Sequence, residues 1–592
     1  MKISDKIAEV LVSNNITDVF MVTGGMAMHL NDSLTRKKEL NVTFFHHEQA
    51  CAMAADAYSR STGKISAICV TAGPGGINAL NGVFGAYADS IPMLILSGQV
   101  RTDTLNSEKN LRQLGDQEAP ITKMVESITK YSKTITRKEN IEYEIQKAIS
   151  TLSNGRKGPV WIDIPIDIQG TEFKKTNKLF REKKEISTNK EVEQIKILEK
   201  RLNESKRPLI IAGGGIRSSG STDQFRIFVN KLNIPVVTAF NGHDLLWESH
   251  KNFIGRCGTI GDRRGNLAVE CADFILVLGS SLNIRQIGYN FEKFGKNKYF
   301  CYVDIDKEEL SKKTIRQNLD LPINIDLNKF FKLFNVDKIK KNKNHEVFNK
   351  WSKKVKKNYS IENESYPDTK KINPYEMTLS LSKMSRSNDI ILTSNATAAI
   401  VPHQAFLTKR NQRFFTNSTS GSMGYGIAAS IGASIGNKKS RIICFEGDGS
   451  LQMNIQELAT ISHNKLNIII LVFSNNGYHS IRQTQKNYFS DNLVGIDEET
   501  GLSFPNLKDI SGGYGLNYIK ITKRNVKSFI KNFNKLDTPL LVDVEVDENI
   551  DFQPRIKSKK NSEGTIVSPE LYDMHPFLPE KEIENLLKIK NN

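Results

Sequence analysis

Short apolar runs that end at glycine or aspartate recur along the chain, and helical periodicity follows most of them. Apolar runs of about four to eight residues are typical of buried parallel strands, and amphipathic segments between them are typical of crossover helices. The predicted strands of the first block are Asp18–Thr23, Val42–Phe45, Ser66–Thr71, Met93–Ser97 and Val160–Ile164. Those of the second block are Pro208–Ala212, Ile234–Thr238, Phe274–Leu278 and Tyr299–Val303. Those of the third block are Asp389–Thr393, Arg441–Phe445, Asn467–Phe473 and Leu540–Val544.

Two charged stretches separate these blocks. Residues Gln169 to Glu191 follow the first block, a lysine-rich stretch near 338–371 follows the second, and we predict both to be linkers. The pattern therefore predicts an α/β protein with three doubly wound domains, at residues 1–170, 190–335 and 370–548. A polar, proline-containing tail at residues 549–592 completes the chain, without a clear secondary-structure pattern.

Composition is that of a soluble protein that forms a core, with 39% hydrophobic and 25% charged residues in a chain of 592. The 83 lysines and arginines exceed the 65 acidic residues and leave a formal net charge of +18. The excess is uneven, since nine lysines and one acid lie between Lys338 and Lys357. No aromatic residues alternate with basic ones there, which favours a solvated linker, and we expect no nucleic-acid partner.

The cysteines are scattered along the chain, without a CxxC pair or a neighbouring histidine at metal spacing. This pattern excludes a disulfide scaffold and a zinc ribbon, and it fits a reducing compartment. The N-terminal segment has charges throughout and no apolar core of signal-peptide length. No apolar run approaches the roughly 18 residues that span a bilayer. We therefore expect a cytoplasmic protein with no membrane partner.

The sharpest chemical signal is the pair of segments Gly447–Ser450 and Asn475–Gly477. Asp448 comes just after one predicted strand, and Asn475, 27 residues later, comes directly after the next. Both side chains should emerge at the carboxyl ends of parallel strands, where such sheets bind ligands. A helix predicted over Leu451–His463 would bring its free N–H groups to the same place. A carboxylate, an amide oxygen and a backbone carbonyl suit Mg²⁺, so the sequence predicts a Mg²⁺–diphosphate site.

The triple glycine Gly213–Gly215 follows a predicted strand, as a dinucleotide fingerprint would. The G-x-G-x-x-G pattern requires a further glycine where this chain has Ser218. We therefore interpret the glycines as a tight strand-to-helix turn.

With GDGSLQMNIQELAT and SNNGY in this order, the chain resembles the thiamine-diphosphate (ThDP) enzymes, and in particular the acetolactate synthase-like group. The resemblance covers almost the whole chain, in the family's order of pyrimidine-binding, central and diphosphate-binding domains. It implies that Asp448 and Asn475 supply side-chain ligands to Mg²⁺ and that Gly477 supplies its carbonyl. It also implies that Gly447, Gly449 and Ser450 bind the cofactor.

The first block carries HHEQA, and Glu48 in it matches the catalytic glutamate of the family. A carboxyl group that is hydrogen-bonded to the aminopyrimidine ring favours the imino tautomer, which can remove the thiazolium proton. Further matches imply cofactor contacts from Gly421 and Met423, which would bend the cofactor, and from Pro74, in the loop that faces the pyrimidine ring. Gly25 is a further expected cofactor contact.

Gln117, in RQLGDQE, matches a substrate-side glutamine of acetolactate synthases. Arg101–Glu118 lacks the histidine pair of simple decarboxylases in this family, which favours a carboligase. The expected enzyme decarboxylates a 2-oxo acid, with pyruvate the first candidate, and transfers the acyl unit to an acceptor carbonyl. The alternatives are a ThDP-dependent decarboxylase or C–C lyase, and an inactive scaffolding homologue. The resemblance implies a site shared across a two-fold interface, hence a homodimer or homotetramer.

FAD is a further candidate cofactor, because Gly255–Thr259 and Val303–Asp306 follow the pattern of acetolactate synthases. Ser281 and Ile284 depart from it, since an arginine and an acid are expected there. The tail segment Asp573–Leu578 resembles a subgroup that is linked to polysaccharide and unusual-sugar pathways, so the acceptor stays open.

Overall fold

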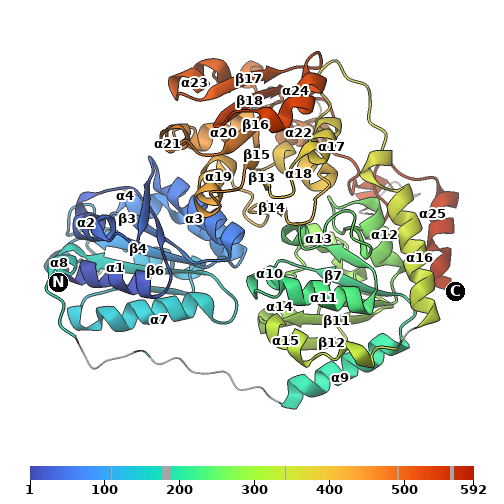
Figure 1. The fold of residues 1–592 in the computed structure, drawn as a ribbon, viewed down its shortest axis with the longest axis horizontal. Coiled ribbons are helices and arrows are strands. Elements are labelled where there is room, and N and C mark those ends of the chain that lie inside the picture. The colour runs from blue at the N-terminus through green and yellow to red at the C-terminus, as the bar shows by residue number, and fades with distance from the viewer. Residues whose placement is uncertain are drawn as a thin grey trace.

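The computed structural model describes residues 1–108, 110–175, 180, 189–340, 342–489, 492–560, 566–567 and 569–591. Figure 1 shows three α/β units, each with helices packed on both faces of a sheet. Each sheet has six strands, and all strand pairs within these sheets are parallel. The predicted fold class, three doubly wound domains, is confirmed.

The N-terminal sheet has the strand order β2-β1-β3-β4-β6-β5. Its strands are β1 Asp18–Met21, β2 Asn41–Phe44, β3 Ser66–Val70, β4 Met93–Gln99, β5 Tyr131–Thr134 and β6 Pro159–Pro165. Its helices are α1 Ile3–Ser13, α2 Met28–Arg36, α3 Glu48–Thr62, α4 Pro74–Asn78, α5 Leu80–Ala88, α6 Ile121–Met124, α7 Ile141–Ser153 and α8 Ile166–Gly170.

The central sheet has the order β12-β11-β10-β7-β8-β9. Its strands are β7 Pro208–Ala212, β8 Val236–Thr238, β9 Phe253–Arg256, β10 Phe274–Leu278, β11 Tyr299–Asp304 and β12 Leu321–Asn324. Its helices are α9 Asn189–Glu204, α10 Gly215–Ser218, α11 Thr222–Leu232, α12 Arg263–Cys271, α13 Ile284–Ile287, α14 Lys307–Ser311, α15 Leu327–Leu333 and α16 Lys343–Asn358.

The C-terminal sheet has the order β14-β13-β15-β16-β18-β17. Its strands are β13 Ile390–Thr393, β14 Arg413–Phe415, β15 Ile442–Gly447, β16 Ile468–Ser474, β17 Asn517–Ile521 and β18 Leu540–Glu545. Its helices are α17 Pro374–Met384, α18 Thr397–Ala405, α19 Tyr425–Gly436, α20 Asp448–Leu451, α21 Glu457–His463, α22 His479–Phe489, α23 Leu507–Gly513 and α24 Val526–Asn532. The helix predicted over Leu451–His463 is interrupted, because a 3₁₀ turn at Gln452–Asn454 separates α20 from α21.

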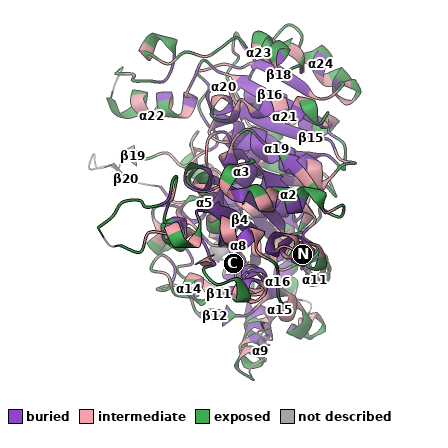
Figure 2. Ribbon diagram, turned by 90° about the vertical axis from the view of Figure 1, so that its left-hand side faces the viewer, coloured by how far each residue is buried: buried purple, intermediate pink, exposed green. Residues whose placement is uncertain are grey.

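Helices α3 and α19 join the N-terminal domain to the C-terminal domain. Helix α3 is rich in alanine and α19 in alanine and glycine, and a Cβ added to Gly432 would lie only 1.8 Å from the Ala54 carbonyl oxygen. Small side chains therefore let the two helix backbones approach closely. Figure 2 shows these helices and the sheets beside them as the buried centre of the molecule.

The prediction of a linker near 338–371 was wrong over much of its length, because α16 occupies Lys343–Asn358. His345, Phe348, Ser352 and Val355 form a buried stripe on this helix, while its lysines lie mainly on the other face. The helix packs on β9 and α12 of the central domain. The linker predicted from Gln169 also begins later, since Gln169 is buried in α8; residues 176–179 and 181–188 of it lie outside the described chain.

The C-terminal tail folds back onto the central domain and ends near α12. Helix α25, Glu580–Leu587, packs against α12. Arg263 of α12 donates hydrogen bonds to the backbone carbonyls of Met574, at 2.9 Å, and Pro576, at 2.6 Å. Across the described residues, no helix is both long and apolar enough to span a bilayer.

Candidate active site

Asp448 lies at the carboxyl edge of the C-terminal sheet, where β15 passes into α20 after Gly447. Strand β16 runs parallel beside β15, so Asn475 emerges at the same edge. One Asp448 oxygen accepts the N–H of Gly449 at 2.8 Å, and the other accepts those of Asn475 at 3.0 Å and Gly477 at 3.1 Å. Burial raises the pKa of the Asp448 carboxyl to about 6, although these N–H groups act in the opposite direction.

The side chain of Asn475 leaves one oxygen without a partner. Asn475 is buried, its amide nitrogen lies 3.4 Å from the Thr397 hydroxyl, and its Oδ1 has no hydrogen-bond partner among the described residues. A buried amide oxygen without a donor is costly unless a ligand satisfies it. A hard cation would do so, and together with the Asp448 carboxylate this oxygen fits Mg²⁺.

The loop that carries Asn475 is held in a strained conformation. Asn476 and Gly477 have positive φ angles of 57° and 106°, and a Cβ on Gly477 would lie 1.9 Å from the Ile496 carbonyl oxygen. Arg482 of α22 donates hydrogen bonds to the backbone carbonyls of Asn475 and Asn476. The Gly477 carbonyl accepts the His479 N–H at 2.9 Å and keeps a second lone pair. Arg482, which the sequence reasoning missed, therefore fixes the loop.

Ser450 links the Asp448 turn to the glycine-rich loop before α19. Its Oγ accepts the Gly424 N–H at 2.9 Å and lies 2.9 Å from the Ser394 hydroxyl. Gly421 has φ 63° and is exposed, and Met423 is half-buried. The predicted cofactor-binding residues of this domain thus lie on two connected loops.

Glu48 is the first residue of α3, in the N-terminal domain. It is buried, and one carboxylate oxygen accepts a hydrogen bond from the Asn78 amide at 3.0 Å. The other faces the turn before α4, because a Cβ added to Gly75 would lie 3.3 Å from it. Pro74 begins α4 in this turn.

The same turn meets the loop of Gln117. Gly73 has φ 58°, and a Cβ there would lie 2.3 Å from the Gln117 carbonyl oxygen. Gln117 also has a positive φ, and its side chain is exposed. The structure therefore brings Glu48, Pro74 and Gln117 together at one edge of the N-terminal sheet. Gly25 is exposed just after β1, where the neighbouring Gly24 packs on Thr71 at the end of β3.

The loop of Gln117 is organised by its neighbour Glu118, which the sequence reasoning did not identify. The Glu118 carboxylate accepts the backbone N–H groups of Asn106 at 2.6 Å, Leu114 at 3.1 Å and Gly115 at 3.1 Å. A carboxylate with three such donors is a strong anchor for a loop without regular structure.

The two groups of residues lie on different domains of one chain. Within the described residues, no hydrogen bond joins Glu48 to Asp448, Ser450 or Asn475. The domains meet beside these groups, where the Ser422 hydroxyl donates to the Asn81 amide oxygen at 2.7 Å.

His479, one of the remaining histidines near the site, is buried beside Thr397. Its Nδ1 lies 2.9 Å from the Thr397 hydroxyl, and its Nε2 lies 3.1 Å from the Gln483 amide nitrogen. Burial lowers its pKa to about 4, so the ring is neutral near pH 7. These contacts make it a support for the Asn475 loop.

Family models match each of the three domains. Residues 1–120 match the N-terminal TPP-binding domain of thiamine pyrophosphate enzymes, 195–332 the central domain, and 396–544 the C-terminal TPP-binding domain. The chain therefore belongs to the family of thiamine pyrophosphate, or ThDP, enzymes.

Within this family, the chain is of the acetolactate synthase type. It is 32% identical to the acetolactate synthase large subunit of Buchnera aphidicola subsp. Schizaphis graminum, over 91% of this chain and 94% of that protein. It is 30% identical to the corresponding subunit of Lactococcus lactis, over 98% of each chain. It is 28% identical to acetolactate synthase 1, chloroplastic, of Oryza sativa, over 94% of this chain and 86% of that protein. The prediction of a ThDP-dependent, acetolactate synthase-like enzyme is confirmed.

Proposed function

We propose that this enzyme is a Mg²⁺- and ThDP-dependent carboligase that decarboxylates pyruvate and transfers the acyl unit to an acceptor carbonyl. The observation that carries the proposal is the unpartnered Asn475 amide oxygen beside the Asp448 carboxylate, in a chain that matches all three ThDP-enzyme domains. Bound ThDP supplies a carbon nucleophile and an electron sink. Asp448, Asn475 and the Gly477 carbonyl would hold Mg²⁺, while Gly447, Gly449 and Ser450 bind the diphosphate.

Glu48 holds a proton at the pyrimidine ring in this proposal. Its carboxyl is shielded from water, and Asn78 orients it through one oxygen, so the other is available for a hydrogen bond to the ring. Pro74 and Gly25 would face the same ring, and Gly421 and Met423 would set the bend of the cofactor. Gln117 would contact the substrate, on the loop that Glu118 anchors.

The enzyme would work as a homodimer or homotetramer, with Glu48 of one protomer facing the diphosphate site of its partner. Three large apolar side chains on α4 and α5, Ile77, Phe84 and Tyr87, are exposed in the single chain. They lie on the helices that follow the Pro74 turn, which supports a protein interface beside the active site. Size-exclusion chromatography of the holoenzyme tests the assembly.

A second cofactor position is supported in the central domain. A cavity of about 570 Å³ lies at the carboxyl ends of β7, β10 and β11, and Gly214, Gly279 and Asp304 line it. This is the switch point of the sheet, where nucleotides bind in doubly wound folds. Burial raises the pKa of Asp304 to about 6, and Arg156 and Arg217 bring positive charge. We assign any FAD of this chain to this cavity. The absorbance spectrum of the supernatant after denaturation of the protein tests whether FAD is bound.

The products from pyruvate test the reaction. Purified protein with ThDP, Mg²⁺ and pyruvate should release CO₂ and form acetolactate, which mass spectrometry identifies. Free acetaldehyde instead would favour the decarboxylase alternative. If CO₂ release requires an added keto-sugar, the acceptor is a sugar and the enzyme belongs to the sugar-modifying subgroup, which the Asp573–Leu578 tail resembles. No turnover with either acceptor would contradict pyruvate as the donor.

A further inference from the structure

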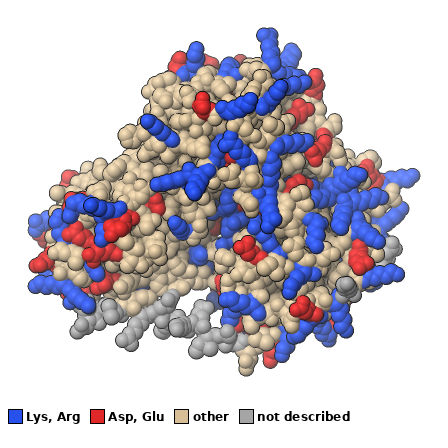
Figure 3. All heavy atoms as spheres, in the orientation of Figure 1, with Lys and Arg blue, Asp and Glu red and all other residues tan. Residues whose placement is uncertain are grey.

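A second cavity lies between the central and C-terminal domains, away from the groups described above. Its volume is about 1020 Å³, and α16, residues 247–251, the end of α17 and residues 407–410 form its walls. Among the described residues that line it, none belongs to the predicted cofactor site. Lysine and arginine side chains crowd this side of the molecule in Figure 3. We call the cavity with these walls the basic cavity.

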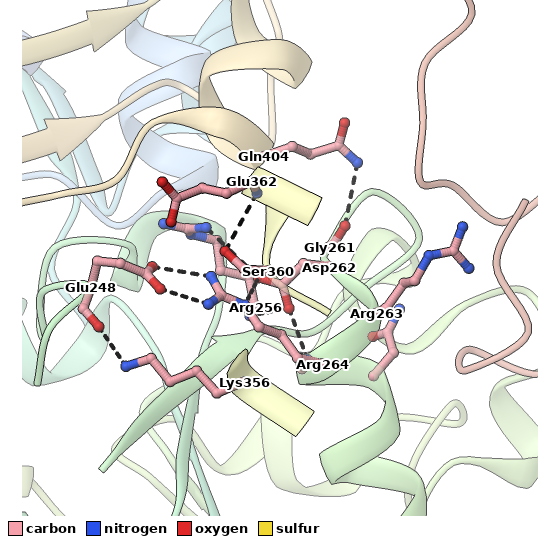
Figure 4. A network of polar contacts seen from close by, with 12 residues as sticks. Glu248, Arg256, Gly261, Asp262, Arg263, Arg264, Lys356, Ser360, Glu362 and Gln404 are labelled. Carbon is pink, nitrogen blue, oxygen red and sulfur yellow. Dashed lines mark hydrogen bonds and ion pairs between the residues drawn. The ribbon is translucent and has the colours of Figure 1, made fainter. Parts of the chain in front are cut away.

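The charge of the basic cavity is strongly unbalanced. Eight lysines and arginines line it, against two glutamates. Both glutamates are already paired. Glu248 binds Arg264 through two contacts of 2.6 and 3.0 Å, which Figure 4 shows, and Glu362 binds Lys383 at 2.7 Å. Burial alone would raise the pKa of Glu248, but the Arg264 guanidinium lowers it to about 2, so its charge is used inside the protein.

Six of the eight cations have no ion-pair partner among the described residues. Lys356 and Lys409 donate hydrogen bonds to backbone carbonyls, and the other four have no such bond, namely Lys251, Lys353, Lys357 and Arg410. Lys353 and Lys357 stand one turn apart on α16, and both are exposed. Arg410 faces them from the C-terminal domain, and its guanidinium lies 5.4 Å from the centre of the Trp247 ring. The unpaired charges therefore come from opposite walls of one concave site.

A buried histidine in the cavity wall is exposed to the same positive field. Burial, together with the nearby Lys356, Lys251 and Arg226, lowers the pKa of His250 to about 4, so the ring adds no charge near pH 7. The Thr408 hydroxyl, buried in the cavity wall, has no hydrogen-bond partner among the described residues.

We propose that the basic cavity binds a small molecule that carries at least two phosphate charges. Lysine and arginine are the usual phosphate ligands, and four unpaired cations on two walls exceed what one carboxylate can neutralise. Free oligophosphate and a nucleoside diphosphate share this chemistry. Trp247 offers an aromatic wall that only the second would use.

Isothermal titration of the holoenzyme, saturated with ThDP and with Mg²⁺ in excess, tests the proposal with ADP and inorganic pyrophosphate as probes. We expect one site per chain, in addition to the ThDP site. The double variant Lys353→Glu, Lys357→Glu should weaken binding by more than about tenfold, because two attractive contacts become repulsive. The control Lys527→Glu, Lys531→Glu places the same change at the same spacing on exposed positions of α24 and should leave the affinity within about twofold.

The source of the phosphates follows from the comparison of the probes. Equal affinities for ADP and pyrophosphate would indicate that the natural ligand is a free oligophosphate. If ADP binds more tightly and Trp247→Leu removes that difference, the natural ligand is a nucleotide. Either result supports the site. Arg410→Gln gives an independent test from the other wall if the α16 variant fails to fold. Absence of saturable binding by both probes would overturn the proposal. Equal affinities of the α16 and α24 variants would overturn it too, because the probes would then bind elsewhere, such as in the central-domain cavity.

Discussion

At the residue scale, Arg482 is the strongest example of a residue that acts through the backbone. Its guanidinium holds the carbonyls of Asn475 and Asn476, and it forms an ion pair with Asp497 at 3.2 Å. We expect Arg482→Gln to weaken Mg²⁺-dependent ThDP binding by about 10- to 100-fold, as is typical when a group behind a metal ligand is removed. Cofactor affinity measured against Mg²⁺ concentration checks this. The exposed Arg524→Gln serves as control, and equal affinities in the two variants would contradict the role of Arg482.

Glu118 should affect the donor substrate rather than the cofactor. Glu118→Gln replaces three charge-assisted bonds from backbone N–H groups with weaker ones, and the Gln117 loop should lose its fixed position. We expect KM for the 2-oxo acid to rise about tenfold, with ThDP affinity unchanged. Steady-state kinetics and cofactor titration separate the two effects. A loss of ThDP affinity with an unchanged KM for the 2-oxo acid would indicate that the Gln117 loop contacts the cofactor and not the substrate.

The difference between what the sequence predicted and what it missed is physical. Asp448 and Asn475 follow buried strands directly, so their positions were predictable from the apolar pattern. Arg482, Glu118 and Asn78 bind to loops or side chains that only the folded chain brings near them, and no local pattern marks such partners.

At the element scale, the strands that the apolar pattern missed are all at sheet edges. They are β5, β9, β12, β14 and β17. Most edge strands are only partly buried, as in β12 with its alternation of buried and exposed residues, and therefore lack a continuous apolar run. Interior strands are buried on both faces, and β7 and β10 were predicted with their observed bounds.

Helix α16 was mistaken for a linker because its lysines conceal an apolar stripe. Phe348 is fully buried on this stripe and stacks on Trp351, with ring centres 5.4 Å apart. We expect Phe348→Ala to lower the free energy of unfolding of the central domain by about 3–5 kcal/mol. The exposed Lys354→Ala on the same helix should change it by less than about 0.5 kcal/mol. Urea denaturation measures the free energy of unfolding of both variants, and equal values would favour the linker interpretation of this segment.

At the scale of the whole molecule, a buried histidine pair joins the central and C-terminal domains. Nδ1 of His243 lies 3.2 Å from Nδ1 of His403, Arg256 lies 2.8 Å from the other nitrogen of His243, and His403 stacks on Phe240. Because Arg256 can only donate, His243 accepts at Nε2 and donates from Nδ1. Burial lowers the pKa of both histidines well below 6.5, so both are neutral in the folded protein.

This pair should make the domain junction sensitive to acid. Below about pH 6.5 the unfolded chain binds protons at both rings and the folded chain does not, so stability is present above that pH and falls as the pH drops. Each ring should contribute up to about 1.4 kcal/mol per pH unit. Thermal unfolding between pH 7 and pH 5 checks this, and His403→Phe should reduce the pH dependence. An unchanged dependence in that variant would contradict the assignment.

The arrangement of the whole chain separates the two halves of the proposed chemistry, with Glu48 in the first domain and Asp448 and Asn475 in the third. In the proposed function, Glu48 activates a cofactor which the third domain binds. This division of labour predicts that activation and binding can be lost independently.

Exchange of the thiazolium C2 proton of bound ThDP in deuterated water tests this claim most directly. Glu48→Gln should retain binding of ThDP and Mg²⁺ but slow the exchange by at least about a hundredfold, the typical contribution of a positioned proton-transfer group. Glu126→Gln, an exposed glutamate of the same domain, should exchange as the wild type does. Exchange in Glu48→Gln at the wild-type rate, with the cofactor bound, would contradict the account.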